Sequence, residues 1–202
     1  MAPKKLAIVI GSTRTPRIGP HIAEYLANAL KALAGAVTID IIDIADFALP
    51  VFDEPNLPLL APAGDPTPFY AHSHTRKWSA AIRPFDAFIF VTPEYNAGIP
   101  GALKNAIDFL FQEWTGKPAA IVSYGSTAGK KSAAHLRDVL LHGVYMKPVE
   151  TMIGLQTGIT SLDTVMKTGT FDPQDVERWQ EAGFLGQVET MFNQLVSAVN
   201  SQ

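Results

Sequence analysis

Short apolar runs alternate with helix-like patterns along this chain. Runs without polar alternation are typical of strands buried on both faces, as in a parallel sheet covered by helices. Five stretches of four to six residues mostly fit this description, and they are Leu6–Ile10, Val37–Ile42, Ala87–Val91, Ala119–Val122 and, with more polar residues, Val149–Ile153. The pattern therefore predicts five buried, parallel strands.

Between these runs, apolar residues recur at the 3.6-residue spacing of amphipathic helices. A last stripe runs from Val176 to Val199, and the N-cap signature Asp172-Pro173 before it predicts a C-terminal helix over residues 172–200. The other expected helices cover Ile22–Leu33, Thr75–Ile82, Ala102–Leu110 and Ala133–Leu141. This order predicts one domain, residues 1–202, with an α/β, doubly wound, five-stranded parallel sheet and helices on both faces.

An irregular segment interrupts the alternation before the third strand. It spans residues 46–74 and holds six of the 15 prolines. A loop of this length without regular structure is usually functional or disordered. Two interpretations remain open: a lid, or a rigid surface excursion fastened by Phe47, Phe52 and Phe69.

Composition excludes several classes of function. The 202 residues carry 16 basic and 19 acidic side chains, a net charge of −3, which gives no electrostatic case for binding nucleic acid or an anionic membrane. Without cysteine, thiol catalysis and Cys-type zinc sites are excluded. No segment approaches the roughly 20 apolar residues of a membrane span, and none resembles a secretory signal. We therefore expect a cytoplasmic protein.

Three polar, glycine-containing segments follow the first, third and fourth predicted strands. Ligands of open parallel sheets bind outside the carboxyl ends of the strands, so these segments are the candidate site. They are residues 11–19 (GSTRTPRIG), 93–98 (PEYNAG) and 124–130 (YGSTAGK).

The first segment suits a phosphate monoester. Ser12 and Thr13 supply hydroxyls, Arg14 supplies a guanidinium, and the N–H groups of the following helix point the same way. The segment matches neither the dinucleotide motif G-x-G-x-x-G nor the P-loop. A helix start with solvated arginines is an equally good interpretation.

The second and third segments suit a flat heteroaromatic ring. Tyr95 offers a ring and Asn96 an amide that donates and accepts, although an ordinary turn has the same composition. Gly125 and Gly129 let backbone N–H groups approach ring carbonyl oxygens. The rival Walker A interpretation fails, because G-x-x-x-x-G-K-S/T would need Gly at Tyr124 and Ser or Thr at Lys131.

With these segments together, the sequence resembles the NADPH-dependent FMN reductase family of flavodoxin-like proteins. The resemblance rests on GSTR followed by RIG, on TPEYNAGIPGALKNAIDFL (Thr92–Leu110) and on SYG (Ser123–Gly125), and it covers about residues 5–150. It implies that the first segment holds the phosphate of FMN, the second borders its ribityl chain and ring, and the third meets its pyrimidine edge. The implied residues are Ser12, Arg14, Arg17, Ile18, Pro93, Glu94, Tyr95, Asn96, Tyr124, Gly125 and Ser126. Many relatives have two adjacent glycines near Gly125, where this chain has Ser126-Thr127-Ala128.

The resemblance also implies an enzyme. NADPH would pass a hydride to bound FMN, and electrons would then go to free flavin, a quinone, an azo compound or a metal oxyanion. Flavin does the redox chemistry, so no side chain is assigned as catalytic. Four cations are candidates for the NADPH 2′-phosphate: Arg17, Arg83, Lys130 and Lys131. The alternative, a flavodoxin-type electron carrier without its own NADPH turnover, is disfavoured by the small net charge.

Two further expectations concern partners and metals. The family implies a homodimer or homotetramer, with the helix at 102–110 and the following Glu113-Trp114 as the contact surface. His72 and His74 lack an evident third ligand, so we expect solvated loop histidines and no metal site. His135 and His142 are expected to be surface or packing residues.

Overall fold

The computed structural model describes residues 3–201, so residues 1, 2 and 202 of the predicted domain lie outside the described residues. Within them, five strands form a sheet in which all neighbours are parallel, in the order β2-β1-β3-β4-β5. This is the strand order of flavodoxin-like doubly wound sheets, which confirms the predicted fold class. The strands are β1 (Lys5–Ile10), β2 (Thr38–Asp43), β3 (Ala87–Pro93), β4 (Pro118–Gly125) and β5 (Lys147–Gln156).

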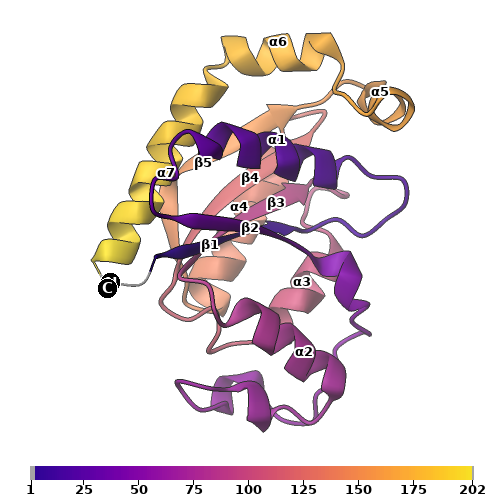
Figure 1. The fold of residues 1–202 in the computed structure, drawn as a ribbon. Helices are drawn as coiled ribbons and strands as arrows, with labels where there is room; N and C mark the ends of the chain where they lie inside the picture. The colour runs from indigo at the N-terminus through magenta and orange to yellow at the C-terminus, as the bar shows by residue number, and fades with distance from the viewer. Residues whose placement is uncertain (1–2, 202) are drawn as a thin grey trace.

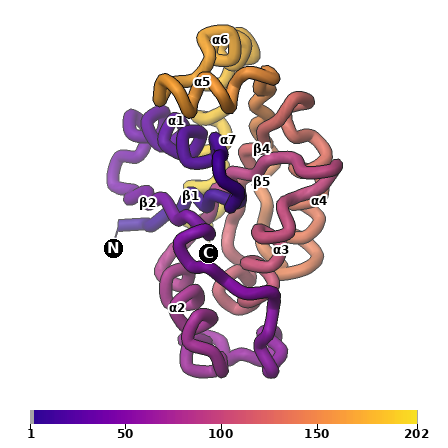
Figure 2. Tube along the Cα trace, turned by 90° about the vertical axis from the view of Figure 1, so that its right-hand side faces the viewer, coloured from indigo at the N-terminus to yellow at the C-terminus, as the bar shows by residue number. Residues whose placement is uncertain are grey.

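Helices cover both faces of this sheet (Figures 1 and 2). On one face pack α1 (Gly19–Lys31) and α7 (Phe184–Asn200), and on the other pack α2 (Ser73–Ile82), α3 (Gly101–Asp108) and α4 (Lys130–Asp138), which a π-helical turn at 139–143 extends. Successive side chains of a strand point to opposite faces. In β1, Leu6 and Ile8 therefore enter the first core, and Ala7 and Val9 the second. Two buried faces explain why the strand is apolar throughout.

The C-terminal helix predicted over residues 172–200 is two helices, so that prediction was wrong in detail. α6 (Pro173–Glu181) begins after Asp172, whose carboxylate accepts from Gln174 N at 3.0 Å. The helix stops before Gly183, whose φ of 78° lies in the left-handed region that glycine adopts without strain. A further helix, α5 (Ser161–Thr168), was not predicted. α5 and α6 lie together at the upper end of the molecule in Figures 1 and 2.

The proline-rich segment 46–74 lies at the opposite end of the molecule from α5 and α6 (Figures 1 and 2). Short 3-10 turns at 44–47, 58–60 and 67–69 give it local structure. The ring of Phe47 packs on Trp78 at 4.7 Å, and that of Phe52 on Phe109 at 5.2 Å. Asn105 of α3 donates to Pro50 O at 2.7 Å and accepts from Phe52 N at 2.9 Å. These contacts favour the rigid excursion over the lid.

Across residues 3–201, no helix combines the length and apolar character needed to cross a membrane.

Candidate functional site

The turns after β1, β3 and β4 meet at the carboxyl edge of the sheet around a cavity of about 260 Å³. In Figure 1 the first of them is the indigo loop to the right of α1. Most of the predicted site residues line the cavity: Arg14, Arg17, Ile18, Pro93, Glu94, Tyr95, Tyr124 and Gly125. The turn after β5 completes the wall with Thr157, Gly158, Ile159, Ser161 and Leu162. Segments far apart in the sequence thus converge on one site.

Three predicted residues do not line this cavity. Ser12 is buried beside the start of α1. Asn96 is exposed at the tip of its turn. Ser126 lines a separate hollow of about 370 Å³, together with Lys130 and Arg178. The structure therefore brings neither the Asn96 amide nor the Ser126 hydroxyl to the cavity wall.

The first turn offers an unsatisfied hydroxyl at an uncapped helix start. Ser12 Oγ is buried, forms no hydrogen bond of standard geometry among the described residues, and has the Tyr124 hydroxyl as a neighbour that it interacts with weakly. No side chain caps α1, where Ile18 is the N-cap residue. A Cβ at Gly19 would collide with Ser12 Oγ and lie 3.0 Å from Tyr124 Oη, so glycine allows both hydroxyls to approach the helix. A buried donor without a hydrogen bond of standard geometry next to free N–H groups fits a bound phosphate.

The two arginines of this turn have different surroundings. Arg17 forms a forked pair with Asp43 at the end of β2, with one N–O distance of 2.9 Å, and also donates to Ser12 O. The hydrogen bond to Asp43 raises the pKa of Arg17. Arg14 is exposed, forms no ion pair with any residue from 3 to 201, and lies 5.3 Å from the ring centroid of Tyr95. Arg14 is therefore the cation available to an anion, whereas Arg17 fixes the turn to the sheet.

The second turn is a tight reversal that is tied to the third. Tyr95 N donates to Gly98 O at 2.9 Å and Gly98 N to Tyr95 O at 3.0 Å, while Asn96 and Ala97 adopt φ values of 49° and 66°. Burial raises the pKa of the Tyr95 phenol, against the opposing effect of the nearby arginines, so the ring is neutral. The Glu94 carboxylate accepts from the Lys131 N–H at 3.0 Å and so caps α4.

The third turn depends on a glycine that no other residue could replace without strain. Gly129 has a φ of 64°, and a Cβ there would lie 2.7 Å from Tyr124 N. Ala128 N donates to Gly125 O at 2.9 Å, and Ser123 Oγ donates to Ala128 O at 2.8 Å. Ala128 itself has a φ of 59°, a left-handed conformation that costs a non-glycine residue about 1 kcal/mol. The departure from the double glycine is therefore accommodated by strain at one alanine.

The structure separates the four cations considered for the NADPH 2′-phosphate. Arg17 is neutralised by Asp43. Arg83 precedes β3, at the amino edge of the sheet, and pairs with Asp65 at 3.4 Å. Lys130 and Lys131 are exposed at the start of α4, beside the third turn. Of these four cations, only the two lysines lie at the carboxyl edge without an ion pair among residues 3–201.

Two further predictions were wrong: two residues expected at a subunit contact are buried within the chain, and the histidines expected to be solvated are half-buried and hydrogen-bonded. Glu113 and Trp114, expected in a contact surface between subunits, are buried within the chain, and Trp114 packs 5.0 Å from Phe88. His72 and His74 bind Asp53, through its backbone oxygen at 3.1 Å and its carboxylate at 2.9 Å, and so hold the proline-rich segment. His135 Nδ1 accepts from Ile99 N at 3.4 Å and His142 is exposed, as expected for packing and surface residues.

The turn after β5 was missed by the sequence reasoning. Its residues, TGITS, have the composition of an ordinary turn. The strand before it was predicted to end at Ile153, but it runs on to Gln156. The rule that places ligands at the carboxyl ends of parallel strands applies equally to this strand, and it was the available signal.

Comparisons with known proteins agree with this geometry. The model of the family described as NADPH-dependent FMN reductase matches residues 4–158. The chain is 38% identical over 182 residues to the NAD(P)H-dependent FMN reductase ntnL of Nectria sp, covering 89% of each chain. It is 33% identical over 184 residues to a 2-hydroxy-1,4-benzoquinone reductase of Burkholderia sp, covering 83% of this chain and 91% of the relative. Its fold matches FerB, a flavoenzyme NAD(P)H:(acceptor) oxidoreductase of Paracoccus denitrificans, with a TM-score of 0.70 at 22% identity, over 96% of this chain and 98% of that one.

Proposed function

The chain belongs to the NADPH-dependent FMN reductase family, and on that premise we propose that it is an FMN-dependent oxidoreductase that takes electrons from NADPH. One observation carries the assignment of the site: an unpaired arginine and a buried, unsatisfied serine hydroxyl lie at the uncapped start of α1, beside a cavity walled by the other turns. These groups fit the phosphate of FMN.

The first, second and third turns of this chain would together hold FMN. Arg14, Ser12 and the N–H groups at the start of α1 would bind its phosphate. Pro93, Tyr95 and Gly125 would border the remainder of the molecule. Arg17 keeps the first turn in place through Asp43, and Glu94 keeps the second turn against the start of α4.

When bound, FMN would accept a hydride from NADPH and pass electrons to the acceptor. Backbone N–H groups of the third turn would stabilise negative charge on the reduced ring. Burial raises the pKa of Tyr124, as it does that of Tyr95, so both phenols stay neutral at the cavity wall. Lys130 and Lys131 would meet the 2′-phosphate of NADPH, because both are exposed at the start of α4 beside the third turn.

The acceptor would be a small oxidant: free flavin, a quinone, an azo compound or a metal oxyanion. Free flavin and quinones are favoured among these, because similar proteins that cover most of this chain are named FMN reductase and benzoquinone reductase. The same relatives disfavour the electron-carrier alternative, because they are named as reductases and the alignment with this chain covers 89% and 91% of their length.

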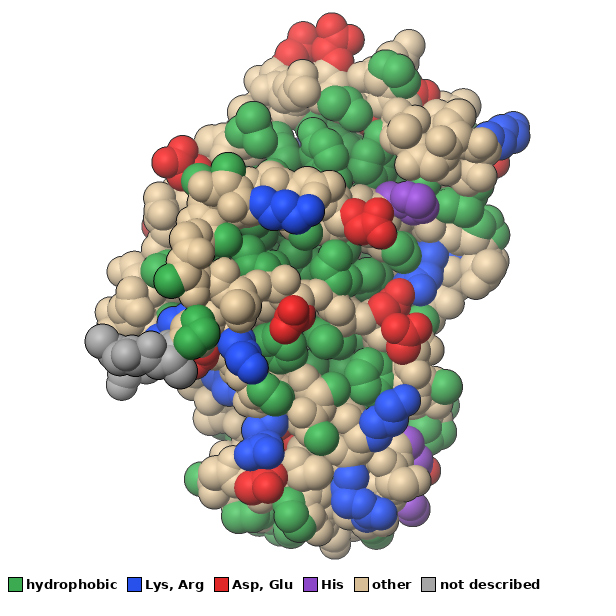
Figure 3. Space-filling model, viewed as in Figure 1, with side chains coloured by type: hydrophobic (Ala, Val, Ile, Leu, Met, Phe, Trp, Pro, Cys, Tyr) green, Lys and Arg blue, Asp and Glu red, His purple; other side chains and the backbone are tan. Residues whose placement is uncertain are grey.

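The assembly is proposed to be a homodimer or homotetramer in which the proline-rich segment contributes the contact surface. Val51, Leu57, Leu59 and Leu60 are exposed large apolar residues on this segment. Green, apolar side chains lie among charged ones on this lower end of the molecule in Figure 3. Adjacent exposed apolar side chains are typical of protein interfaces. A Leu60→Asp variant should lower the mass measured by light scattering, and an unchanged mass would exclude this surface.

The enzymatic proposal is tested by anaerobic reduction. FMN-loaded protein is mixed with NADPH or with NADH, and the absorption of the oxidised flavin is followed. NADPH should bleach it, and a quinone added afterwards should restore it. Retention of the oxidised spectrum with both coenzymes would contradict the reductase assignment and favour the electron carrier.

A further inference from the structure

The wall formed by the turn after β5 differs chemically from the rest of the cavity. Its residues are Thr157, Gly158, Ile159, Ser161 and Leu162, none of which is charged. The turn after β1, which also lines the cavity, carries both Arg14 and Arg17. The family match ends at residue 158, so most of this turn and all of α5 and α6 lie beyond it.

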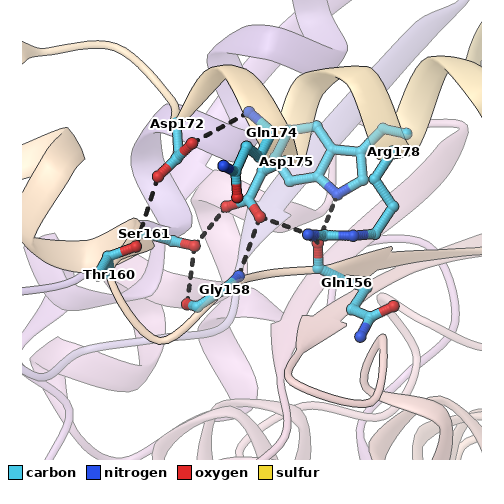
Figure 4. Close-up of polar contacts among 9 residues, drawn as sticks. Gln156, Gly158, Thr160, Ser161, Asp172, Gln174, Asp175 and Arg178 are labelled. Carbon is cyan, nitrogen blue, oxygen red and sulfur yellow. Dashed lines mark hydrogen bonds and ion pairs between the residues drawn. The ribbon is translucent and has the colours of Figure 1, made fainter.

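A buried carboxylate on α6 fixes this turn (Figure 4). Asp175 is 1% exposed. Its Oδ1 accepts from Gly158 N at 3.0 Å and from Arg178 Nη1 at 2.7 Å, and its Oδ2 accepts from the Ser161 hydroxyl. Ser161 Oγ also lies 2.8 Å from Gly158 O. Hydrogen bonds to an ionised acceptor are about twice as strong as neutral ones, so this carboxylate holds both ends of the turn firmly.

The strand that leads into the turn is held from two sides. Gln156 O accepts from Arg178 Nη1 at 3.2 Å and from Trp179 Nε1 at 2.8 Å. On the other side, Thr157 N donates to Gly125 O at 3.0 Å, which joins this turn to the third one. Trp179 is buried against Tyr25 and Phe171, so α6 itself is anchored in the core.

This rigid turn presents an exposed apolar side chain at the cavity. Ile159 lies between the two anchored positions, lines the cavity and is fully exposed. Asp172, the other carboxylate near the turn, caps α6 by accepting from Gln174 N and also accepts from Thr160 Oγ1 at 3.4 Å (Figure 4). An isoleucine fixed at a cavity rim gains burial only when the cavity is occupied.

We infer that the turn at 157–162 is a fourth binding segment, with Ile159 contacting the uncharged ring of FMN and Asp175 acting as the positioning residue that holds Ile159 in place. The inference rests on the proposed function, because it takes FMN as the occupant. The absence of charge from this wall assigns it to the ring, and Arg14 of the first turn takes the phosphate.

The test measures binding rather than turnover. Apoprotein is titrated with FMN and with riboflavin, which lacks the phosphate, and the quenching of flavin fluorescence gives both dissociation constants. Ile159→Ala removes three carbons from a partly covered contact. It should raise the dissociation constants of FMN and of riboflavin by the same factor, roughly five- to tenfold. Asp175→Asn should weaken the binding of both flavins by a similar factor and alter the visible spectrum of the bound flavin.

A double-mutant cycle separates positioning from general stability. If Asp175 acts through Ile159, the Ile159→Ala effect should fall below about twofold in the Asp175→Asn background. Matched controls are Asp163→Asn, an exposed carboxylate on α5 that pairs with Lys167, and Leu185→Ala, an exposed leucine on α7. Both should bind FMN as the parent does. If Asp175→Asn does not fold, Ser161→Ala replaces it in the cycle, since it removes one of the same hydrogen bonds.

The outcomes distinguish the two proposals. A parent protein that binds no FMN overturns the proposed function and the inference together. A parent that binds FMN while Ile159→Ala binds it equally well overturns the inference alone. Weakened FMN binding with unchanged riboflavin binding would place the turn at the phosphate and overturn the ring assignment. Additive effects in the cycle would overturn the positioning role of Asp175.

Discussion

Replacing Arg14 by alanine separates cofactor binding from folding. The Arg14 side chain is exposed, has no ion-pair partner among residues 3–201, and contacts only the ring of Tyr95 in the interactions described above. A cation–π contact at an exposed site contributes about 0.5–1 kcal/mol, which sets the upper limit on the stability that Arg14→Ala loses.

The effect on FMN should be larger. A hydrogen bond to a charged group contributes about 1.5–3 kcal/mol, and each 1.4 kcal/mol is a factor of ten in affinity. Arg14→Ala should therefore raise the dissociation constant of FMN by roughly 10- to 100-fold. Riboflavin has no phosphate, so its dissociation constant should change by less than about twofold. Arg14→Lys keeps the positive charge but loses the paired N–H donors of the guanidinium. Its dissociation constant for FMN should lie between those of the parent and Arg14→Ala.

Arg17→Ala is the matched comparison. Its guanidinium and the Asp43 carboxylate are mostly buried, with 17% and 16% of their side chains exposed. Removing the cation leaves the carboxylate without its partner and should destabilise the protein by roughly 1–3 kcal/mol, less than a fully buried pair. Arg17→Ala should therefore lose more stability than Arg14→Ala and less FMN affinity.

Fluorescence titration gives the affinity of each variant for FMN and for riboflavin. Urea denaturation of the apoprotein gives the stability of each variant. The reasoning is refuted if Arg14→Ala leaves the ratio of FMN affinity to riboflavin affinity unchanged. It is also refuted if the two arginine variants lose stability equally, because their ion pairing would then not differ as the structure has it.

Three further predictions test separate features of the site and its surroundings. Ser12→Ala removes a buried hydroxyl without a hydrogen bond of standard geometry, so the apoprotein should keep or gain thermal stability while FMN affinity falls roughly tenfold or more; a destabilised apoprotein with unchanged FMN affinity would contradict this. Gly129→Ala forces a Cβ to within 2.7 Å of Tyr124 N at a φ of 64°, so it should lower the free energy of unfolding by more than about 1 kcal/mol. The control Gly116→Ala, at a φ of 77° and with no atom within 4 Å of the added Cβ apart from those of its chain neighbours, should lower the free energy of unfolding less. Glu54 accepts from Ala71 N and His72 N at 2.9 Å; burial raises the pKa of its carboxyl, but the Thr75 hydroxyl and these N–H groups outweigh burial and lower it overall. Its contribution should thus be complete above its ordinary pKa of 4.5 and be lost as the pH falls below it, so the melting temperatures of the parent and Glu54→Gln should differ at pH 7 and converge near pH 3; a constant difference would refute the linkage.

The central strands β1, β3 and β4 were predictable because burial on both faces leaves a continuous apolar run. Residues such as Leu6 and Ala7 enter opposite cores, and no position in β1 after Lys5 is exposed. The prediction of full burial was wrong for β2 and β5, which lie at the edges of the sheet and have several exposed positions. The three turns were predictable because the carboxyl edge of a parallel sheet gathers ligand-binding residues. Arg14, Tyr95 and Gly125 duly line one cavity.

What could not be predicted depends on tertiary contacts. The apolar stripe continues on both sides of the helix break at Gly183, and the position of α6 depends on tertiary contacts such as the packing of Trp179 on Phe171 and its hydrogen bond to Gln156 O. Arg14 and Arg17 are chemically identical in the sequence, and only Asp43, 26 residues further along, distinguishes them. Trp114 follows an amphipathic helix, and its burial depends on aromatic residues of a strand and of α2.

The central claim is that turns from separate strands form one site for FMN. Equilibrium titration of the colourless apoprotein with FMN tests it most directly, with the fluorescence of the free flavin as the signal. The account predicts saturation at one FMN per chain, with tighter binding of FMN than of riboflavin. Absence of saturable binding, or equal affinity for the two flavins, would contradict it.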